Sequence, residues 1–289
     1  MIIALLGTGL MGAPMTRCLQ AAGHELHVWN RSPEKAEALA DIATVHRSPN
    51  DAVKQAEVVI SMLADGVITR LVLDQQGVIN DAPEQAIFIN MGSVEPECDI
   101  ELAKIAMEQN KRYLDAPVSG GVKGAEEASL TIFVGGSVED LEAARPALEA
   151  MGRPNLIGQT GAGQTAKLAN QLIVAITIGA VSEAFKLAES SGCDLAVLQQ
   201  ALQGGFADST ILKQHGLRMV NRDFEPGGRS QSQLKDIRNA LALAGQSELD
   251  LPLANTVEAG FTSLVNEYDG ADLDHSAYFL WLEKRASKV

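Results

Sequence analysis

The hydrophobic pattern changes near residue 160, and this change constrains the fold of the chain most strongly. Before it, short apolar runs such as IIALLG, EVVISML and LTIFVGG alternate with helical patterns or loops, which predicts a parallel, doubly wound sheet. After Gly163 only helical periodicity remains, and it begins with a long helix from Thr165 to Ser191. We therefore predict an α/β domain over residues 1–162 and an all-helical domain over residues 163–289, joined by that helix.

A glycine-rich motif follows the first apolar run. Gly7, Gly9 and Gly12 have the spacing G-x-G-x-x-G, and a second strand ends about 20 residues later. In a dinucleotide site the first glycine permits a tight turn, the second lets the backbone approach the pyrophosphate, and the third packs the helix on the strand. The alternative is a structural turn, because glycine triplets arise by chance in a chain with 26 glycines. The placement between a strand and a helix favours a Rossmann domain that binds its cofactor through this loop, including Leu10 and Met11.

The residues at the end of the second strand indicate which dinucleotide is bound. An NAD site usually carries an Asp or Glu here, which accepts hydrogen bonds from the ribose hydroxyls. This chain has Asn30, Arg31 and Ser32 instead, and a guanidinium with neutral polar groups can surround a 2'-phosphate that a carboxylate would repel. We predict binding of NADP(H) in preference to NAD(H), with NAD(H) still possible. The alternative is that Arg31 is a solvated surface charge.

Two further motifs carry candidate chemistry. Ser119, Gly120 and Gly121 follow a strand, where a hydroxyl and approachable backbone amides can bind a carboxylate, although such a sequence can also form a plain turn. Lys167 precedes Asn170 and Gln171 by three and four residues, so the three side chains share one face of the long helix. A buried lysine can protonate the oxygen that gains charge when a hydride reaches a carbonyl carbon, whereas a lysine early in a helix is more commonly a solvated charge.

Together these motifs resemble the signatures of the β-hydroxyacid dehydrogenase family. The opening GTGLMGAPM is similar to the family form GxGxMGxPM, and the resemblance extends to Lys235 and Asp236, so that it covers essentially the whole chain. It implies that Lys167 is catalytic, that Asn170 orients the substrate, and that Gln171 replaces a second asparagine of several relatives. It also implies a set of residues that contact the cofactor: Met62, Leu63, Ser93 and Lys235. For Lys235 the alternative is a surface lysine of an amphipathic helix.

Three shorter resemblances favour one branch of the family. The runs KLANQ, GGFADS and LDHSA are more similar to tartronate semialdehyde (2-hydroxy-3-oxopropionate) reductases than to 3-hydroxyisobutyrate dehydrogenases. The branch implies NAD(P)H-dependent reduction of a short semialdehyde, or of glyoxylate or succinic semialdehyde, to its hydroxy acid. A 3-hydroxyisobutyrate dehydrogenase is the alternative within the family. A module that binds NADPH without turnover is the alternative from another class, and it would need the first motif alone.

Composition restricts the partners of the chain. The net charge of -14 disfavours nucleic acids and anionic membrane surfaces. We expect a small carboxylate or semialdehyde as the substrate. The three scattered cysteines suggest reduced thiols, and the five histidines lack the spacing of metal ligands, so we expect them to be structural and predict no metal site. No export signal precedes the first motif, which predicts a cytoplasmic protein.

We expect a homodimer or homotetramer. The segment from Thr165 to Ser191 carries a continuous apolar band, and a small helical domain built on it leaves apolar surface that a second copy can cover. Sedimentation velocity checks this expectation, and a monomer at every protein concentration would contradict it.

Overall fold

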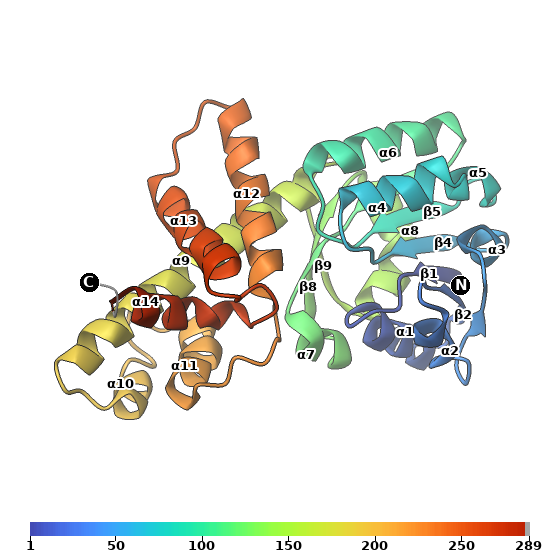
Figure 1. Ribbon diagram of the computed structural model, residues 1–289. Coiled ribbons are helices and arrows are strands. Elements are labelled where there is room, and N and C mark those ends of the chain that lie inside the picture. The colour runs from blue at the N-terminus through green and yellow to red at the C-terminus, as the bar shows by residue number, and fades with distance from the viewer. Residues whose placement is uncertain (287–289) are drawn as a thin grey trace. The chain divides into compact units, whose positions relative to one another are not determined.

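The computed structural model describes residues 1–286, which form two compact units, Met1–Lys167 and a second that begins at Leu168 (Figure 1). The first unit combines strands and helices, and the second contains helices only within the described residues. The predicted fold class is therefore confirmed. Both this division and the predicted boundary between residues 162 and 163 lie within the long helix α9 (Ala162–Ser190).

The first unit is built on a nine-stranded sheet in the order β3-β2-β1-β4-β5-β6-β8-β7, with β9 paired to β8. The strands are β1 (Ile2–Leu6), β2 (Glu25–Trp29), β3 (Thr44–Val45), β4 (Val58–Ser61), β5 (Ile87–Asn90), β6 (Arg112–Asp115), β7 (Val118–Ser119), β8 (Leu130–Gly135) and β9 (Gly152–Gly158). Strands β1 to β6 are parallel, as predicted, but β8 runs antiparallel to β6 and β7. The order reverses beside β1, which in doubly wound sheets is where a ligand binds.

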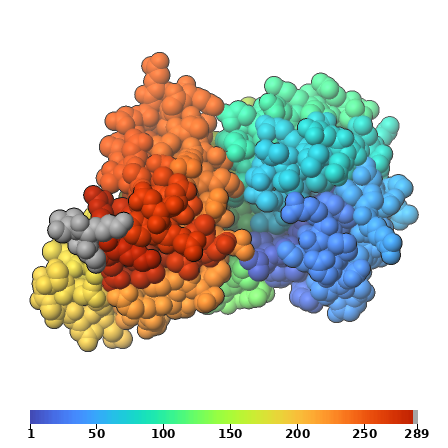
Figure 2. Space-filling model, viewed as in Figure 1, coloured from blue at the N-terminus to red at the C-terminus, as the bar shows by residue number. Residues whose placement is uncertain are grey.

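Successive side chains of each strand enter opposite cores. On β1, Ile3 and Leu5 pack into one hydrophobic cluster, and Ala4 and Leu6 pack into another, as the period of two in a strand requires. The first cluster is covered by α1 (Gly12–Ala21), α2 (Pro33–Glu37), α7 (Gly121–Glu126) and α8 (Val138–Glu149). The second is covered by α3 (Pro49–Val53), α4 (Gly66–Arg70), η1 (Leu71–Gln75), α5 (Val78–Asp81) and α6 (Pro96–Glu108). The space-filling view shows the atoms of α4 to α6 closing over this second face (Figure 2).

The sequence did not predict the two-residue strands β3 and β7 or the edge strand β9. The apolar pattern of YLDAPVSG predicts a single strand, but the structure divides this run into β6 and β7 at Ala116 and Pro117. Strand β9 contains Pro154 and is largely exposed or half-buried, so it lacks both the alternation and the apolar content of a core strand. Proline is tolerated there because β9 pairs only with β8.

The start of α9 is fixed by a buried carboxylate at the end of β6. The Asp115 side chain accepts hydrogen bonds from the backbone amides of Gly161 (2.8 Å) and Gln164 (2.9 Å). A Cβ atom on Gly163 would lie only 2.4 Å from the carbonyl oxygen of Phe133, so the helix backbone packs directly on the sheet. Asp115 thus caps the helix and compensates its N-terminal dipole.

A second buried carboxylate, Asp99 of α6, ties this helix to the strands. Its oxygens accept hydrogen bonds from Asn90 Nδ2 (2.8 Å), the Tyr113 hydroxyl (2.7 Å) and Gln164 Nε2 (2.8 Å). Gln164 Nε2 also donates to the carbonyl of Gly92, and Gln164 Oε1 accepts from the amide of Val94. The network therefore joins the loop after β5 to the first turn of α9.

The second unit is helical throughout its described residues. Its elements after α9 are α10 (Leu195–Ala201), η2 (Leu212–Gly216), α11 (Leu217–Asn221), α12 (Ser230–Gln246), α13 (Pro252–Glu267), η3 (His275–Ala277) and α14 (Tyr278–Ala286). Their core is aromatic, with Phe185, Phe261, Tyr278 and Phe279 almost fully buried. Element η2 is a π-helix, which the periodicity of the sequence did not indicate.

The long helix α9 is only partly buried. Its most apolar 18-residue window has a mean hydropathy of 1.5, but only 39% of that window is buried. Ile173 and Leu187 are 68% and 72% exposed. By length and composition α9 is the one helix of residues 1–286 that could cross a membrane, a criterion that core helices also meet. Helix α9 is thus buried along one side only.

The Asp99 network makes the stability of the first unit depend on pH. Burial raises the pKa of Asp99 from 3.8 to about 7, an increase to which Asp115 contributes and which hydrogen bonds from Tyr113, Asn90 and Gln164 partly offset. A carboxyl group whose pKa is higher in the folded than in the unfolded chain stabilises the fold increasingly as the pH falls. Between about pH 8 and about pH 5, we expect the free energy of unfolding of the wild type to rise by roughly 2 kcal/mol relative to Asp99→Asn.

Urea denaturation at both pH values measures this difference. Glu108→Gln on the exposed end of the same helix is the control, and its stability should follow the wild type at both pH values. Parallel pH dependence in the wild type and Asp99→Asn would show that Asp99 does not titrate in this range.

Candidate active site

The glycine motif forms a tight loop between β1 and α1. Gly7 has a φ of +105°, and a Cβ atom there would lie 2.4 Å from the carbonyl oxygen of Met62. A Cβ on Gly12 would lie 1.9 Å from the carbonyl oxygen of Gly7, whereas one on Gly9 would meet nothing within 4 Å. Gly7 and Gly12 are thus required by the fold, while Gly9 leaves open space beside its backbone, as close approach of a ligand requires.

The loop has the free polar groups that a dinucleotide needs. Helix α1 has no side-chain cap at Met11 and no acidic residue in its first turn, so its N-terminal dipole can attract phosphate. The Thr8 hydroxyl is buried, and its oxygen has no hydrogen-bond partner within residues 1–286. Leu10 is 71% exposed at the loop tip. These features fit a pyrophosphate at the start of α1.

The structure separates the three residues that we assigned to the 2'-phosphate. Asn30 is committed to the loop, because its Oδ1 accepts from the amide of Thr8 (3.0 Å) and its Nδ2 donates to the carbonyl of Ser32 (3.0 Å). Arg31 is exposed and makes no hydrogen bond or ion pair with any described residue. Ser32 precedes α2, and its hydroxyl caps no amide of that helix. Asn30 thus shapes the loop, while Arg31 and Ser32 are available to a ligand.

The loops after β1, β2, β4 and β5 lie along one edge of the sheet. The register pairs Leu6 with Trp29 and with Ser61, and Ser61 with Asn90, so the segments that follow these residues are neighbours. Leu63 contacts both sides, since a Cβ on Gly7 would lie 3.2 Å from its Cδ2 and one on Gly92 would lie 2.8 Å from its oxygen. The structure therefore brings Met62, Leu63 and the turn that carries Ser93 beside the glycine loop.

The predicted carboxylate-binding loop needs its glycines. Ser119 ends β7 and is half-buried, and Gly120 and Gly121 have φ angles of +138° and +63°. Side chains other than glycine rarely adopt the first of these conformations. The two exposed glycines leave the backbone amides at the start of α7 accessible, which is the property that anion binding requires.

Lys167 is one of two buried lysines among residues 1–286, with 8% of its surface exposed; the other is Lys111. It lies three residues after Gln164 on the same face of α9. Gln164 bridges the two sides of the turn that contains Ser93. The ammonium of Lys167 is thus carried by a helix turn that the Asp99 network fixes to the loop after β5.

The remaining predicted residues, Asn170, Gln171 and Lys235, belong to the second unit. Asn170 and Gln171 form a row of side-chain amides with Gln233. Asn170 Nδ2 donates to Gln171 Oε1 (2.9 Å), and Gln171 Nε2 donates to Asp236 Oδ2 (2.8 Å). Gln233 Nε2 donates to the backbone carbonyl of Gln171 (3.1 Å). Lys235 lies beside this row, with its Nζ 3.3 Å from Asp236 Oδ1.

Sequence reasoning missed the residues that support these side chains. Gln164 lies inside the motif that drew attention to Lys167, but its partner Asp99 is 65 positions away in the sequence. Gln233 and Asp236 flank Lys235 without forming a motif of their own. The histidines also meet in pairs, His27 with His46 (2.9 Å) and His215 with His275 (3.2 Å). No local spacing signals contacts of this kind.

Two family models match the chain. Residues 2–163 match the family model described as the NAD-binding domain of 6-phosphogluconate dehydrogenase. Residues 161–282 match the model described as the NAD-binding domain of NADP-dependent 3-hydroxyisobutyrate dehydrogenase. Both parts of the chain therefore have the fold and motifs of nicotinamide-dependent dehydrogenases.

Three relatives are similar over nearly their whole length. The chain is 37% identical to 2-hydroxy-3-oxopropionate reductase of Escherichia coli, covering 99% of each protein, and 30% identical to glyoxylate/succinic semialdehyde reductase 1 of Arabidopsis thaliana, covering 96% of each. A solved structure of Mycobacterium tuberculosis 3-hydroxyisobutyrate dehydrogenase with L-serine is 33% identical, with a TM-score of 0.89 and coverage of 97% and 98%. The chain belongs to the 3-hydroxyisobutyrate dehydrogenase-related family of NAD(P)-dependent β-hydroxyacid dehydrogenases.

Proposed function

We propose that the protein reduces a short semialdehyde that carries a carboxylate, with tartronate semialdehyde as the preferred substrate and NADPH as the preferred cofactor. The observation that carries the proposal is the burial of Lys167 on the turn of α9 that Gln164 fixes to the loop after β5. When bound, the cofactor supplies the hydride that reaches the aldehyde carbon. The relatives named above act on substrates of this class by their names.

The residues of the chain have separate roles in this reaction. The ammonium of Lys167 donates a proton to the aldehyde oxygen as charge develops there, and the resulting amine recovers a proton from solvent. The hydroxyl of Ser119 and the amides after Gly120 bind the substrate carboxylate. Asn170 and Gln171 orient the rest of the substrate. In the opposite direction Lys167 accepts the proton from the hydroxyl group.

The amide orientations favour a substrate that carries a hydroxyl group between its aldehyde and its carboxylate. The carboxylate of Asp236 only accepts hydrogen bonds, so Gln171 directs its Nε2 toward Asp236. The Oε1 of Gln171 is therefore directed toward Asn170. Asn170 in turn commits one N–H to Gln171, and its Oδ1 remains an acceptor. Tartronate semialdehyde carries a hydroxyl on the carbon between its two functional groups, whereas methylmalonate semialdehyde carries a methyl group there. An acceptor at Asn170 supports the first of these substrates.

Replacement of Lys167 tests the reaction. Initial rates with NADPH against tartronate semialdehyde, glyoxylate, succinic semialdehyde and methylmalonate semialdehyde should give the highest kcat/KM with tartronate semialdehyde. Lys167→Met should lower kcat by about 10²- to 10⁴-fold, because it removes the proton donor, while fluorescence titration gives an unchanged Kd for NADPH.

Lys111→Met is the matched control, since Lys111 is buried to a similar extent, 9% exposed, in the same unit. It should retain the wild-type kcat. Tight NADPH binding without turnover of any of the four aldehydes would support a cofactor-binding module instead, and equal activity in Lys167→Met and the wild type would remove Lys167 from the mechanism.

Charge reversal at Arg31 tests the cofactor preference. Arg31→Asp should weaken NADPH about ten- to a hundredfold relative to NADH, because a charge-assisted contact with the 2'-phosphate is lost and a repulsion is added. The ratio of kcat/KM for the two cofactors measures the effect. Arg153→Asp, at an exposed arginine of β9, should leave the ratio unchanged. An unaltered ratio in Arg31→Asp would mean that Arg31 is a solvated surface charge.

A further inference from the structure

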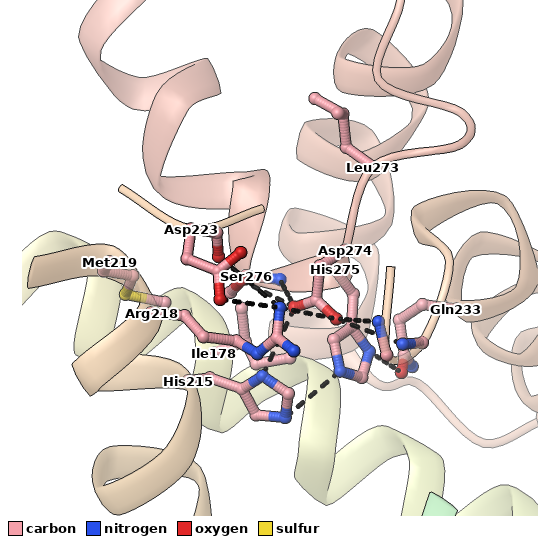
Figure 3. Close-up of polar contacts among 12 residues, drawn as sticks. Ile178, His215, Arg218, Met219, Asp223, Gln233, Leu273, Asp274, His275 and Ser276 are labelled. Atoms are coloured by element: carbon pink, nitrogen blue, oxygen red, sulfur yellow. Dashed lines mark hydrogen bonds and ion pairs between the residues drawn. The ribbon is translucent and has the colours of Figure 1, made fainter. Parts of the chain in front are cut away.

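Folding brings two histidines and a buried aspartate of the second unit together (Figure 3). His215 lies in η2, whereas Asp274 directly precedes η3 and His275 begins it. One possible ligand atom from each of the three residues lies within 4.8 Å of the other two. The spacing of the histidines in the sequence, from which we expected no metal site, could not indicate this cluster.

The hydrogen bonds of the cluster assign the ring protons. Gln233 Nε2 donates to the backbone carbonyl of Gln171 (3.1 Å), so the oxygen of Gln233 faces His275 Nδ1 (3.1 Å), which must donate to it. The Nε2 of a neutral His275 is then a bare acceptor, and His215 Nε2 donates to it across 3.2 Å. Two neutral imidazoles satisfy both bonds, and they leave the Nδ1 of His215 without a proton.

This bare nitrogen faces a carboxylate. The Nδ1 of His215 is buried, lies 3.4 Å from Asp274 Oδ1 and makes no hydrogen bond with any of residues 1–286. Asp274 is fully buried, and backbone amides donate to both of its oxygens, those of Gly227 (3.0 Å) and Gly228 (3.1 Å) to Oδ2 and that of Ser276 (3.0 Å) to Oδ1. A buried lone pair beside a buried carboxylate is unfavourable unless a cation or a hydrogen-bond donor lies between them.

The distance between the two atoms fits a metal ion. Two ligands of a tetrahedral ion with bonds of about 2.0 to 2.1 Å lie roughly 3.3 to 3.4 Å apart. His215 Nδ1 and Asp274 Oδ1 have this separation. Imidazole together with carboxylate suits zinc and the neighbouring divalent transition metals. The side chain of His215 is 15% exposed, which gives an ion from solvent a path to the cluster.

The contacts around the three residues have the form of an outer ligand shell. A histidine that binds a metal usually donates its other ring nitrogen to an oxygen, and a carboxylate that binds a metal accepts further hydrogen bonds. His275 Nδ1 has such a partner in Gln233, and Asp274 Oδ1 accepts from the Ser276 hydroxyl (2.6 Å). The neighbouring cation, Arg218, approaches the other carboxylate oxygen, Oδ2, to 3.9 Å, so Oδ1 is the oxygen left for an ion.

We propose that His215 Nδ1, Asp274 Oδ1 and His275 Nε2 bind a divalent transition-metal ion such as Zn²⁺, and that water completes its coordination. His275 exchanges its contact with His215 for the ion by rotation of its ring, and His215 Nε2 then donates to solvent. The ion links η2 to the start of η3 within the second unit. No step of the proposed reaction uses this ion, so the proposal does not depend on turnover.

Metal titrations of the full chain test the site. After treatment with a chelator, Co²⁺ is added and followed by its visible absorption, which is intense in a tetrahedral site, and Zn²⁺ is then used to displace it. We expect one ion per wild-type chain. His215→Phe and His275→Phe keep a ring but remove its nitrogens, and each should weaken binding about 100-fold or more, because loss of an outer-shell partner alone costs about 10- to 100-fold.

His46→Phe is the matched control, since His27 and His46 form another histidine contact (2.9 Å) in the first unit. It should bind the ion as the wild type does, and circular dichroism checks that each variant is folded. Three results would overturn the proposal: no saturable binding of Co²⁺ or Zn²⁺ by the wild type, equal binding by the wild type and folded His215→Phe, or loss of binding in His46→Phe.

Nuclear magnetic resonance of the wild-type chain labelled with 15N-histidine identifies the ligands even where a variant at His215 or His275 fails to fold. The spectrum of His46→Phe separates the ring signals of the first unit. One equivalent of Zn²⁺ should shift His215 Nδ1 and His275 Nε2 and leave the proton on His275 Nδ1. A shift confined to His27 and His46 would contradict the assignment of the ion to the second unit.

Discussion

The carboxylate of Asp115 beneath the first turn of α9 is the contact on which the candidate site depends. It ends β6, and the sheet register places it opposite Asn90 at the end of β5. It accepts hydrogen bonds from the backbone amides of Gly161, which precedes α9, and of Gln164 in the first turn of α9. These bonds fix the start of the helix to the end of the strand. Burial raises the pKa of Asp115, while hydrogen bonds from the amides of Gly161 and Gln164 lower it by stabilising the charged form. Because Lys167 follows Gln164 by three residues on α9, these hydrogen bonds also fix the position of Lys167.

In the second unit, side-chain amides rather than a carboxylate set the geometry of the predicted site residues. Gln171, Gln233 and Asn170 each have one donor and one acceptor end, so a single fixed partner decides the orientation of the whole row. Asp236 sets one end because it only accepts, and the backbone carbonyl of Gln171 sets the other. This arrangement specifies hydrogen-bonding polarity without a buried charge in the row itself, and polarity is what distinguishes a hydroxyl from a methyl group on a small substrate.

The sequence predicted features that depend on local pattern. Strands β1, β4 and β8, the glycine loop and the long helix α9 lie close to the expected positions, because each has a clear periodicity or characteristic turn residues. Strands β3 and β9 and the division at Ala116 and Pro117 were missed. Strand β3 has only two residues, and the edge strand β9 has neither alternation nor a continuous apolar run. The contacts of Gln164 with Asp99 and of His275 with His215 join residues 65 and 60 positions apart. Such contacts exist only after the chain has folded, so no local signal could reveal them.

The number of residues in the π-helical turn η2 determines whether His215 can contact His275. A π turn takes up one residue more than the α-helix around it, and here that turn contains His215. Without the additional residue, the remainder of the helix would rotate by about 100° relative to what precedes it, and either His215 or the residues that follow it would face a different neighbour. A related protein that has both histidines would therefore keep their contact only if it also has the same number of residues in this turn.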